Sequence, residues 1–157
     1  MNFLKNGFLP VLSPQQITSC DTIDGVEGCN GGDPYSAYQY VEKKGIETNK
    51  AYPYKSGNTQ STGQCKYSKK KVDADVQITG YTVVSSSAEG EKKMATQIQS
   101  SPISICLDAT AFQTYTGGII GAGCGQQVDH CVQAVGIGTS GSGTKYWIVR
   151  NRCVGRR

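Results

Sequence analysis

The sequence predicts an α+β fold in two lobes, a helical lobe over residues 1–78 followed by a β-rich lobe over residues 79–157. Two helix-start signals, each a capping residue followed by proline, lie within the first 34 residues. From residue 76 onward, short stretches rich in Val, Ile, Tyr and Thr alternate with glycine-rich turns. Glycine is abundant, at 20 of 157 residues, which favours strands, turns and loops over long helices.

The first expected helix begins at Ser13-Pro14-Gln15-Gln16. Serine can cap a helix, proline suits the first helical position, and a glutamine at the third position can close a capping box. This helix should be short and end near Cys20. A second helix should begin at Asp33-Pro34, again a cap followed by proline, and Gly45 should end it.

Residues 49–75 are expected to form loops, because turn-forming glycines and prolines recur there. Four strands are expected after them, at residues 76–84, 103–107, 132–137 and 146–149. One helix at about residues 87–99 interrupts the strands, since Met94 and Ile98 stand at helical spacing.

The charge and hydropathy patterns exclude two classes of partner. The net charge of +4 is mild, and the densest basic run, Lys69-Lys70-Lys71, lies in a polar connector. We interpret this run as solvated surface and expect no nucleic-acid partner. No stretch approaches the roughly 18 apolar residues of a membrane-spanning helix, so no membrane partner is expected. Residues 1–12 lack the cleavage-site pattern of a signal peptide, so a targeting signal is expected outside this chain.

The cysteines are informative because there are seven of them, scattered along the chain, with a single histidine. No pair has the spacing of zinc ligands, so neither a metal nor another cofactor is expected. Scattered cysteines indicate disulfides and hence an oxidising compartment, either lysosomal or extracellular. Because seven is odd, at least one thiol is free or has its partner outside this chain.

Five motifs, in order between residues 12 and 151, resemble those of papain-like (cathepsin-like) cysteine peptidases. They are Leu12-Ser13-Pro14-Gln15-Gln16 with Cys20-Asp21, Gly28-Cys29-Asn30-Gly31-Gly32, Tyr52-Pro53-Tyr54, Val128-Asp129-His130 with Val135-Gly136, and Tyr146-Trp147-Ile148-Val149-Arg150-Asn151. Each motif alone is a weak signal, whereas the ordered set is specific. The resemblance implies a papain-like two-lobe fold whose second lobe is barrel-like.

The resemblance also implies thiol endopeptidase chemistry, in which an imidazolium beside the nucleophilic cysteine stabilises its thiolate. His130, the only histidine, matches the catalytic histidine of the family, and Asn151 matches the asparagine that orients it. A lone histidine is more often a surface or core residue, but the motif around His130 favours the catalytic interpretation.

By the same matching, nine residues fall near the substrate: Gly31, Gly32, Asp33, Pro34, Ile105, Cys106, Val128, Asp129 and Cys131. Glycines lack Cβ and let a peptide backbone approach closely, although a tight turn also explains them. An acidic residue at position 33, where the family often has an aromatic one, suggests a preference for basic substrate side chains. The expected partners are peptide or protein substrates, propeptides or inhibitors.

The resemblance implies a disulfide between Cys20 and Cys65, whereas Cys29 and Cys124 lack their usual partners in this chain. Cys106 and Cys131 fall on facing positions, so we expect a bond between them. The alternative is a pair of thiols that pack as small hydrophobic groups.

Two family features have no match. The nucleophile lies in a Cys-Gly-Ser-Cys-Trp segment preceded by an oxyanion-hole glutamine, and residues 1–12 match the stretch that follows that segment. After Asn151 the family continues Ser-Trp-Gly, where this chain has Arg152-Cys153-Val154. We therefore expect an incomplete papain-like fold and a truncated, catalytically inactive carboxy-terminal piece of a thiol endopeptidase. The alternative is a non-catalytic module that binds peptides or inhibitors.

Overall fold

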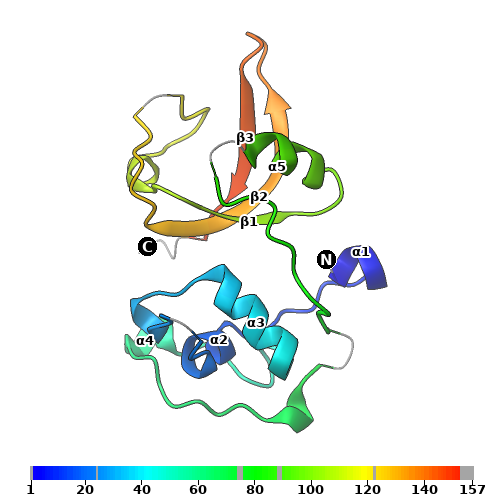
Figure 1. The fold of residues 1–157 in the computed structure, drawn as a ribbon. Helices are drawn as coiled ribbons and strands as arrows, with labels where there is room; N and C mark the ends of the chain where they lie inside the picture. The colour runs from blue at the N-terminus through cyan, green and yellow to red at the C-terminus, as the bar shows by residue number, and fades with distance from the viewer. Residues whose placement is uncertain (1, 24, 74–75, 88–89, 122, 153–157) are drawn as a thin grey trace. The chain divides into compact units, whose positions relative to one another are not determined.

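The computed structural model describes residues 2–23, 25–73, 76–87, 90–121 and 123–152, and its chain divides into two units, Met1–Thr82 and Val83–Arg157. The first unit holds helices and loops, and the second holds a short helix and a three-stranded sheet (Figure 1). The predicted α+β class is confirmed. None of the described helices is long and apolar enough to cross a membrane.

Helices α2 and α3 form the body of the first unit. Helix α2 spans Pro14–Cys20 and helix α3 spans Pro34–Lys44, as the capping signals predicted. Four shorter helical turns accompany them: α1 (Asn2–Asn6), η1 (Gly28–Asn30), α4 (Ser56–Thr59) and η2 (Lys69–Lys71). The last two lie in the region that the sequence predicted to be loops.

The predicted caps are present at both main helices. The Ser13 hydroxyl accepts a hydrogen bond from the Gln16 N–H at 3.0 Å, and the Asp33 carboxylate accepts one from the Tyr35 N–H at 2.5 Å. Gly45 ends α3 with φ +73°, a left-handed conformation that favours glycine. The capping box was wrong in one respect: the Gln16 side chain does not return to Ser13, because it bonds elsewhere.

Gln16 is fully buried, and its side chain forms hydrogen bonds to one group on α3 and to two groups in the segment that follows α3. Its Oε1 accepts from the Glu47 N–H at 2.7 Å, while its Nε2 donates to the Gly45 carbonyl at 3.0 Å and to the Tyr40 hydroxyl at 3.2 Å. Burial raises the pKa of Tyr40, whereas the hydrogen bond from Gln16 lowers it. Gln16 therefore ties α2 to α3 through polar contacts.

Gln15, the neighbouring residue, holds a different loop. Its Oε1 accepts from the backbone N–H groups of Lys55 at 2.7 Å and Ser56 at 2.9 Å, and its Nε2 donates to the Ser56 hydroxyl at 2.6 Å. The Cys20–Cys65 disulfide is present, as predicted, and closes a separation of 45 residues. By the chain-entropy model a loop of this length gives about 4 kcal/mol of stabilisation.

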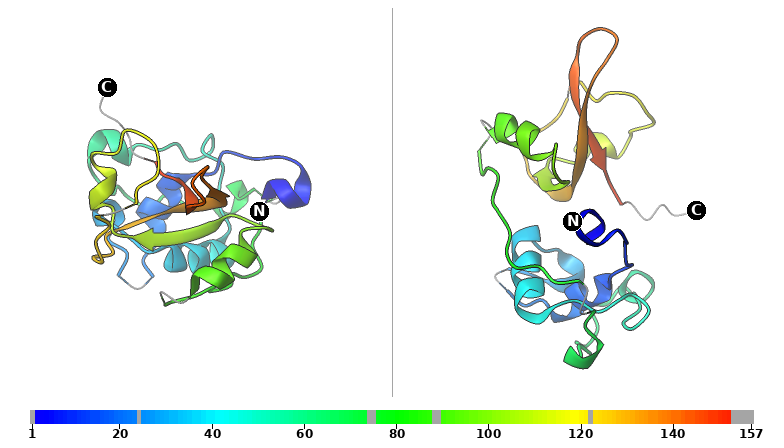
Figure 2. Two further views of the ribbon diagram at one scale, coloured as in Figure 1. Left: turned by 90° about the horizontal axis from the view of Figure 1, so that it is seen from above. Right: turned by 90° about the vertical axis from the view of Figure 1, so that its right-hand side faces the viewer.

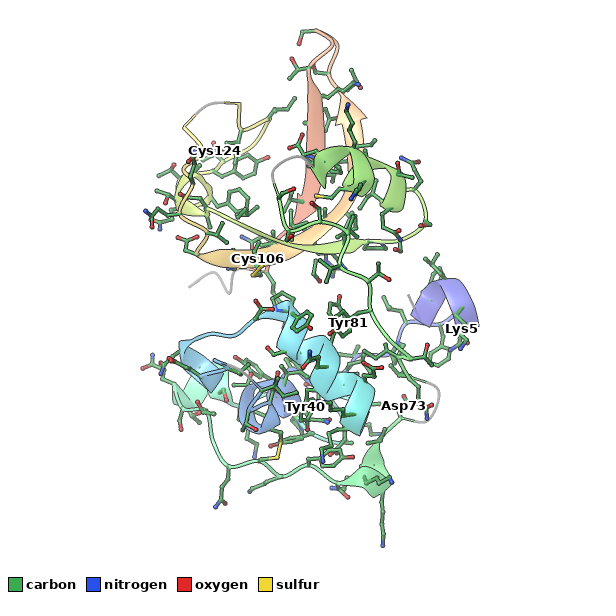
Figure 3. All side chains as sticks on the ribbon, viewed as in Figure 1. Lys5, Tyr40, Asp73, Tyr81, Cys106 and Cys124 are labelled. Atoms are coloured by element: carbon green, nitrogen blue, oxygen red, sulfur yellow. A yellow bond between two sulfur atoms is a disulfide. The ribbon has the colours of Figure 1, made fainter. Side chains whose placement is uncertain are left out.

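The predicted strand at residues 76–84 is wrong. This segment pairs with no strand among the described residues, and Tyr81 instead packs on α3 (Figure 3). The Tyr81 ring meets Tyr35 edge-on at 4.9 Å and stacks on Tyr38 at 6.1 Å, and its hydroxyl accepts from Gln39 Nε2 at 3.1 Å. β-branched residues favour a strand, but a strand also needs a partner for its backbone groups.

The second unit is built on strands β1 (Ile103–Leu107), β2 (His130–Thr139) and β3 (Lys145–Arg150), which confirm the last three predicted strands. All pairs are antiparallel, in the order β1-β2-β3, and a turn joins β2 directly to β3 (Figures 1 and 2). The β2–β3 register shifts between Ala134 and Gly136. Helix α5 spans Glu91–Gln97, shorter than predicted, and residues 88–89 lie outside the described part.

Few apolar side chains among the described residues are fully buried. They are Tyr40, Ile46 and Val76 in the first unit, and Ile98 and Ala134 in the second. The buried polar residues of the first unit outnumber its buried apolar ones: Ser13, Gln15, Gln16, Asp21, Ser36, Glu47 and Ser56. Its stability therefore depends strongly on satisfied hydrogen bonds.

We expect Gln16→Ala to lower the free energy of unfolding by about 3 kcal/mol, because it leaves the buried Glu47 N–H and Gly45 carbonyl without their partner. Chemical denaturation of both proteins measures this difference. The matched control is Gln64→Ala, at an exposed position, which should change stability by less than about 0.5 kcal/mol. Equal effects of the two substitutions would contradict the role given to Gln16.

Candidate active site

His130 and Asn151 meet at one end of the sheet. His130 is the first residue of β2 and Asn151 directly follows β3, so antiparallel pairing brings them to the same end. His130 Nε2 lies 2.9 Å from Asn151 Oδ1, within hydrogen-bonding distance. Both side chains are half-buried. The structure thus joins the two residues that the sequence matched to a catalytic pair.

A second contact fixes the roles of the two groups. Asn151 Oδ1 also accepts a hydrogen bond from the Arg152 backbone N–H at 2.8 Å, so the oxygen of the amide, and not its NH2 group, faces these donors. The ring nitrogen Nε2 must then carry the proton and donate it to Oδ1. In the neutral ring this leaves Nδ1 as the basic nitrogen.

Two aspartates join the residues after β1 to those before β2. The Asp108 carboxylate accepts from the Gln127 N–H at 3.0 Å, and the Asp129 carboxylate accepts from the Ala109 N–H at 2.9 Å. The Asp129 N–H in turn donates to the Leu107 carbonyl at 3.1 Å. These crossed bonds hold the segment that leads directly into His130.

Hydrogen bonds from Thr110, first from its side chain and then from its backbone N–H, together with one from Gln127, hold the pKa of Asp108 below its usual value of 3.8. None of the motifs in the sequence indicated Asp108. An aspartate two residues before a threonine at a strand end is a turn signal that could have indicated it.

The Cys106–Cys131 disulfide is present, which overturns the alternative of two unpaired thiols. These cysteines stand directly opposite each other in the β1–β2 register, with Cα atoms 4.0 Å apart, and the next pair is Leu107 with His130. Cys106 is exposed and Cys131 half-buried. Figure 3 shows Cys106 where the ribbons of β1 and β2 run side by side, and Cys124 on the loop that precedes β2. Cys124 is a free, exposed thiol, as expected.

The predicted substrate residues fall into two groups, one in each unit. In the second unit Ile105 pairs with Val132, next to the disulfide, whereas Val128 and Asp129 are exposed immediately before His130. The structure therefore gathers Ile105, Cys106, Val128, Asp129 and Cys131 around the beginning of β2.

In the first unit Gly31, Gly32, Asp33 and Pro34 form the segment that enters α3. Gly31 is exposed at φ +136°, and no atom lies within 4 Å of the position that a Cβ would take there. Gly31 and the free, exposed Cys29 also line an open hollow of about 470 Å³ between η1 and α4. The carboxylate of Asp33 caps α3, a structural role that accompanies any role toward a substrate.

Within the ranges that the structure covers, no three His, Cys, Asp or Glu side chains are grouped as metal ligands would be. The described groups at this end of the sheet are an imidazole, the amide that contacts it and a neighbouring disulfide.

Comparison with known proteins identifies similar chains. The family model described as "Papain family cysteine protease" matches residues 1–153. Cysteine endopeptidase Rep1 of Oryza sativa subsp. japonica is 36% identical over 154 residues, which cover 96% of this chain and 40% of that protein. Cysteine proteinase RD21A of Arabidopsis thaliana is 42% identical over 154 residues, which cover 96% of this chain and 31% of that protein.

The fold is also similar to solved structures. The bromelain protease from Ananas comosus, in complex with the E64 inhibitor, superposes with a TM-score of 0.81 at 34% identity, covering 96% of this chain and 66% of that one. Digestive procathepsin L 3 of Tenebrio molitor larval midgut gives a TM-score of 0.80 at 32% identity, covering 95% and 47%. The fold predicted from the motifs is thereby confirmed. The chain spans about two fifths of the length of the first of these curated relatives.

We predict that Asp108 makes the stability of the second unit depend on pH. Its lowered pKa means that the carboxylate stabilises the folded state above the unfolded value of 3.8, and that this contribution disappears as the pH falls through the lower folded value. The difference in thermal midpoint between the wild type and Asp108→Asn should therefore be constant above about pH 5 and shrink toward about pH 2.

Glu42→Asn, which removes one exposed carboxylate from α3, serves as the control for loss of a surface charge. A difference between wild type and Asp108→Asn that stays constant down to about pH 2 would contradict this assignment.

Proposed function

Because the chain belongs to the papain family of cysteine proteases, we propose that it carries the histidine and the orienting asparagine of a thiol endopeptidase site, at His130 and Asn151. The observation that supports this proposal most strongly is the 2.9 Å contact between His130 Nε2 and Asn151 Oδ1. A histidine that acts as acid and base needs a fixed orientation and a defined tautomer. This contact meets both requirements, because Oδ1 is an acceptor whose orientation the Arg152 N–H sets.

In the proposed reaction His130 Nδ1 takes the proton of a cysteine thiol, and the resulting thiolate attacks the carbonyl carbon of a peptide bond. The imidazolium then gives this proton to the leaving nitrogen as the C–N bond breaks, and a thioester remains. Water attacks the thioester while Nδ1 accepts its proton, which releases the carboxylic acid and restores the thiol. Throughout these steps the Nε2–H bond to Asn151 keeps the ring in place.

No cysteine of this chain lies in the sequence motif that carries the family's nucleophile. Four of its described cysteines form disulfides, and neither free thiol, Cys29 or Cys124, lies in a Cys-Gly-Ser-Cys-Trp segment. We therefore propose that the polypeptide of 157 residues does not hydrolyse peptides alone, and that its site needs a cysteine provided by further sequence.

The two units are proposed to correspond to the helical and the β-rich lobes of the family. Both units are proposed to carry residues that contact substrate: Gly31, Gly32, Asp33 and Pro34 in the first, and Ile105, Cys106, Val128, Asp129 and Cys131 in the second. The exposed Gly31 backbone suits pairing with an extended peptide. Asp33 is exposed while it caps α3, so its charge favours basic substrate side chains.

A second function is proposed because no described cysteine has the context of the nucleophile. The chain would then be a non-catalytic module that binds peptides, propeptides or inhibitors. Under either function, the two disulfides favour an oxidising compartment, and a lysosomal or extracellular location is proposed.

We predict that the isolated chain of 157 residues neither cleaves a panel of peptide amides nor reacts as a catalytic thiol with an epoxide inhibitor. Mass spectrometry after inhibitor treatment and a fluorogenic peptide assay measure both properties. The control for unspecific alkylation is Cys29→Ser with Cys124→Ser and Cys153→Ser, which removes the three cysteines outside the two disulfides. Hydrolysis by the isolated chain would contradict the proposal that its nucleophile comes from further sequence.

The positive test joins the segment of the bromelain protease that precedes the aligned region to Met1 of this chain. We expect this chimera to cleave peptide amides, and His130→Ala to reduce kcat/KM by about 1,000-fold or more. Asn151→Ala should reduce it about 10- to 100-fold, the loss expected for one orienting hydrogen bond.

The matched control is Gln126→Ala, an exposed substitution four residues before His130 that should leave kcat/KM unchanged. A chimera that cleaves peptides equally well after His130→Ala would overturn the assignment. If the chimera folds and binds peptides but cuts none, the proposed peptidase site is wrong and the non-catalytic binding module is the better interpretation.

A further inference from the structure

We propose that the Cys106–Cys131 disulfide is a positioning element for His130, and that a thiol-class reductant that opens it releases the imidazole from Asn151. The observation that carries this inference is the placement of the disulfide beside Leu107 and His130, the terminal pair of the β1–β2 ladder. The inference rests on the function proposed for His130 and Asn151, but its test measures the geometry of this pair and not proteolysis.

Among the described residues, His130 pairs with β1 only. In the β1–β2 register it is the last pair, opposite Leu107, while the β2–β3 register begins three residues later, at Gln133 with Arg150. Terminal pairs of a ladder open most readily, since they lack a neighbour on one side. The backbone of His130 therefore depends on its contact with β1.

Besides the backbone hydrogen bond from the Asp129 N–H to the Leu107 carbonyl, this segment is held by side-chain hydrogen bonds that are exposed to water. The hydrogen bond from the Ala109 N–H to Asp129 lies in an exposed environment, as do those that Asp108 accepts from Thr110 and Gln127. The connection from η4 (Thr110–Phe112) to β2 is irregular in its described residues and contains Gly117, Gly118 and Gly123 at positive φ. Such a connection gives little support of its own to the position of His130.

The disulfide lies immediately beside this weak point. Cys131 follows His130 in the chain, and Cys106 precedes Leu107, the partner of His130. A covalent bond between these two neighbours prevents the ladder from opening at its last pair. The disulfide thereby also maintains the 2.9 Å contact between His130 and Asn151, because that contact requires the His130 backbone to stay paired with β1.

The bond is also placed where a small thiol can reach it, because Cys106 is exposed. A dithiol supplies the two electrons that opening requires. One of its thiolates attacks a protein sulfur, forms a mixed disulfide and releases the other sulfur as a thiolate, which takes up a proton. The second thiol of the reagent then attacks, as a thiolate, the reagent sulfur of the mixed disulfide and releases the remaining protein sulfur as a thiolate, which takes up a proton. The reagent becomes a cyclic disulfide, and both cysteines become thiols.

The test uses the single histidine of the chain as its reporter. All proteins carry Cys29→Ser, Cys124→Ser and Cys153→Ser, so that no remaining thiol can exchange with the disulfides. Long-range ¹H–¹⁵N spectra measure the fraction of neutral imidazole that carries its proton on Nε2. Asn151→Ala, which removes the acceptor, gives the value of a released ring.

Three forms are compared with the oxidised protein: the protein reduced by dithiothreitol, Cys106→Ser with Cys131→Ser, and Cys106→Val with Cys131→Val. The valine pair fills the site with side chains that favour strands, and so guards against a failure of the serine pair to fold. Cys20→Ser with Cys65→Ser opens the disulfide of the other unit and is the matched control.

The proposal predicts that all three forms move the Nε2–H fraction to the value of Asn151→Ala, while the amide signals of Gly138 and Trp147 stay in place. The control should keep the oxidised value. An unchanged Nε2–H fraction in the reduced protein or the valine pair would overturn the proposal. Loss of the Gly138 and Trp147 signals together with the histidine signature would also overturn it, because the bond would then stabilise the whole sheet and not position one residue.

Discussion

The antiparallel pairing of β2 with β3 is the constraint on which the candidate site depends. The strands β2 and β3 form a hairpin. Asn151, which follows the end of β3, therefore lies beside His130 at the start of β2. The residues are 21 positions apart in the sequence, so only a defined register can bring their side chains within 2.9 Å. The register shift at Ala134/Gly136 is part of this geometry, because a bulge changes the positions that stand opposite each other on either side of it.

The first unit is organised by a different kind of interaction. Gln15 and Gln16 are adjacent on α2 and both buried, yet they satisfy backbone groups of two separate segments, around Ser56 and around Glu47. Each glutamine presents an acceptor and donors on one flat amide, which suits a loop that offers both N–H and C=O groups. This polar arrangement holds the end of α3 through Gly45 and Glu47, and the loop that leads into α4 through Lys55 and Ser56.

Local signals in the sequence predicted the helices and most strands, because caps, prolines and β-branched runs act within a few residues. Residues 76–84 show the limit of such signals. Their composition suits a strand, but Tyr81 packs against Tyr35 and Tyr38, and no strand among the described residues pairs with this segment. The partners of Gln16 and Asp108 could not be predicted either, since hydrogen bonds across 19 to 31 positions depend on the tertiary fold. The two disulfides and the His130–Asn151 pair were expected from whole motifs and not from any single residue.

At the site, one amide oxygen serves two purposes. Asn151 Oδ1 binds the Arg152 N–H, which fixes the amide, and it binds His130 Nε2, which fixes the ring. Nδ1 is then the ring nitrogen without a proton, and the disulfide beside His130 is the bond that we propose to hold the backbone from which the ring extends. A thiol protease site and a peptide-binding module both start from this arrangement, and they differ in whether a cysteine meets Nδ1.

Neutron diffraction from deuterium-exchanged crystals tests the central claim most directly, because it locates the deuteron shared by His130 and Asn151 and distinguishes the amide oxygen from the nitrogen. We expect a deuteron on Nε2 directed at Oδ1, with a second deuteron on the Arg152 nitrogen directed at the same oxygen. An ND2 group of Asn151 facing a bare Nε2 would contradict it, since Nδ1 would then carry the proton and could not accept one from a thiol.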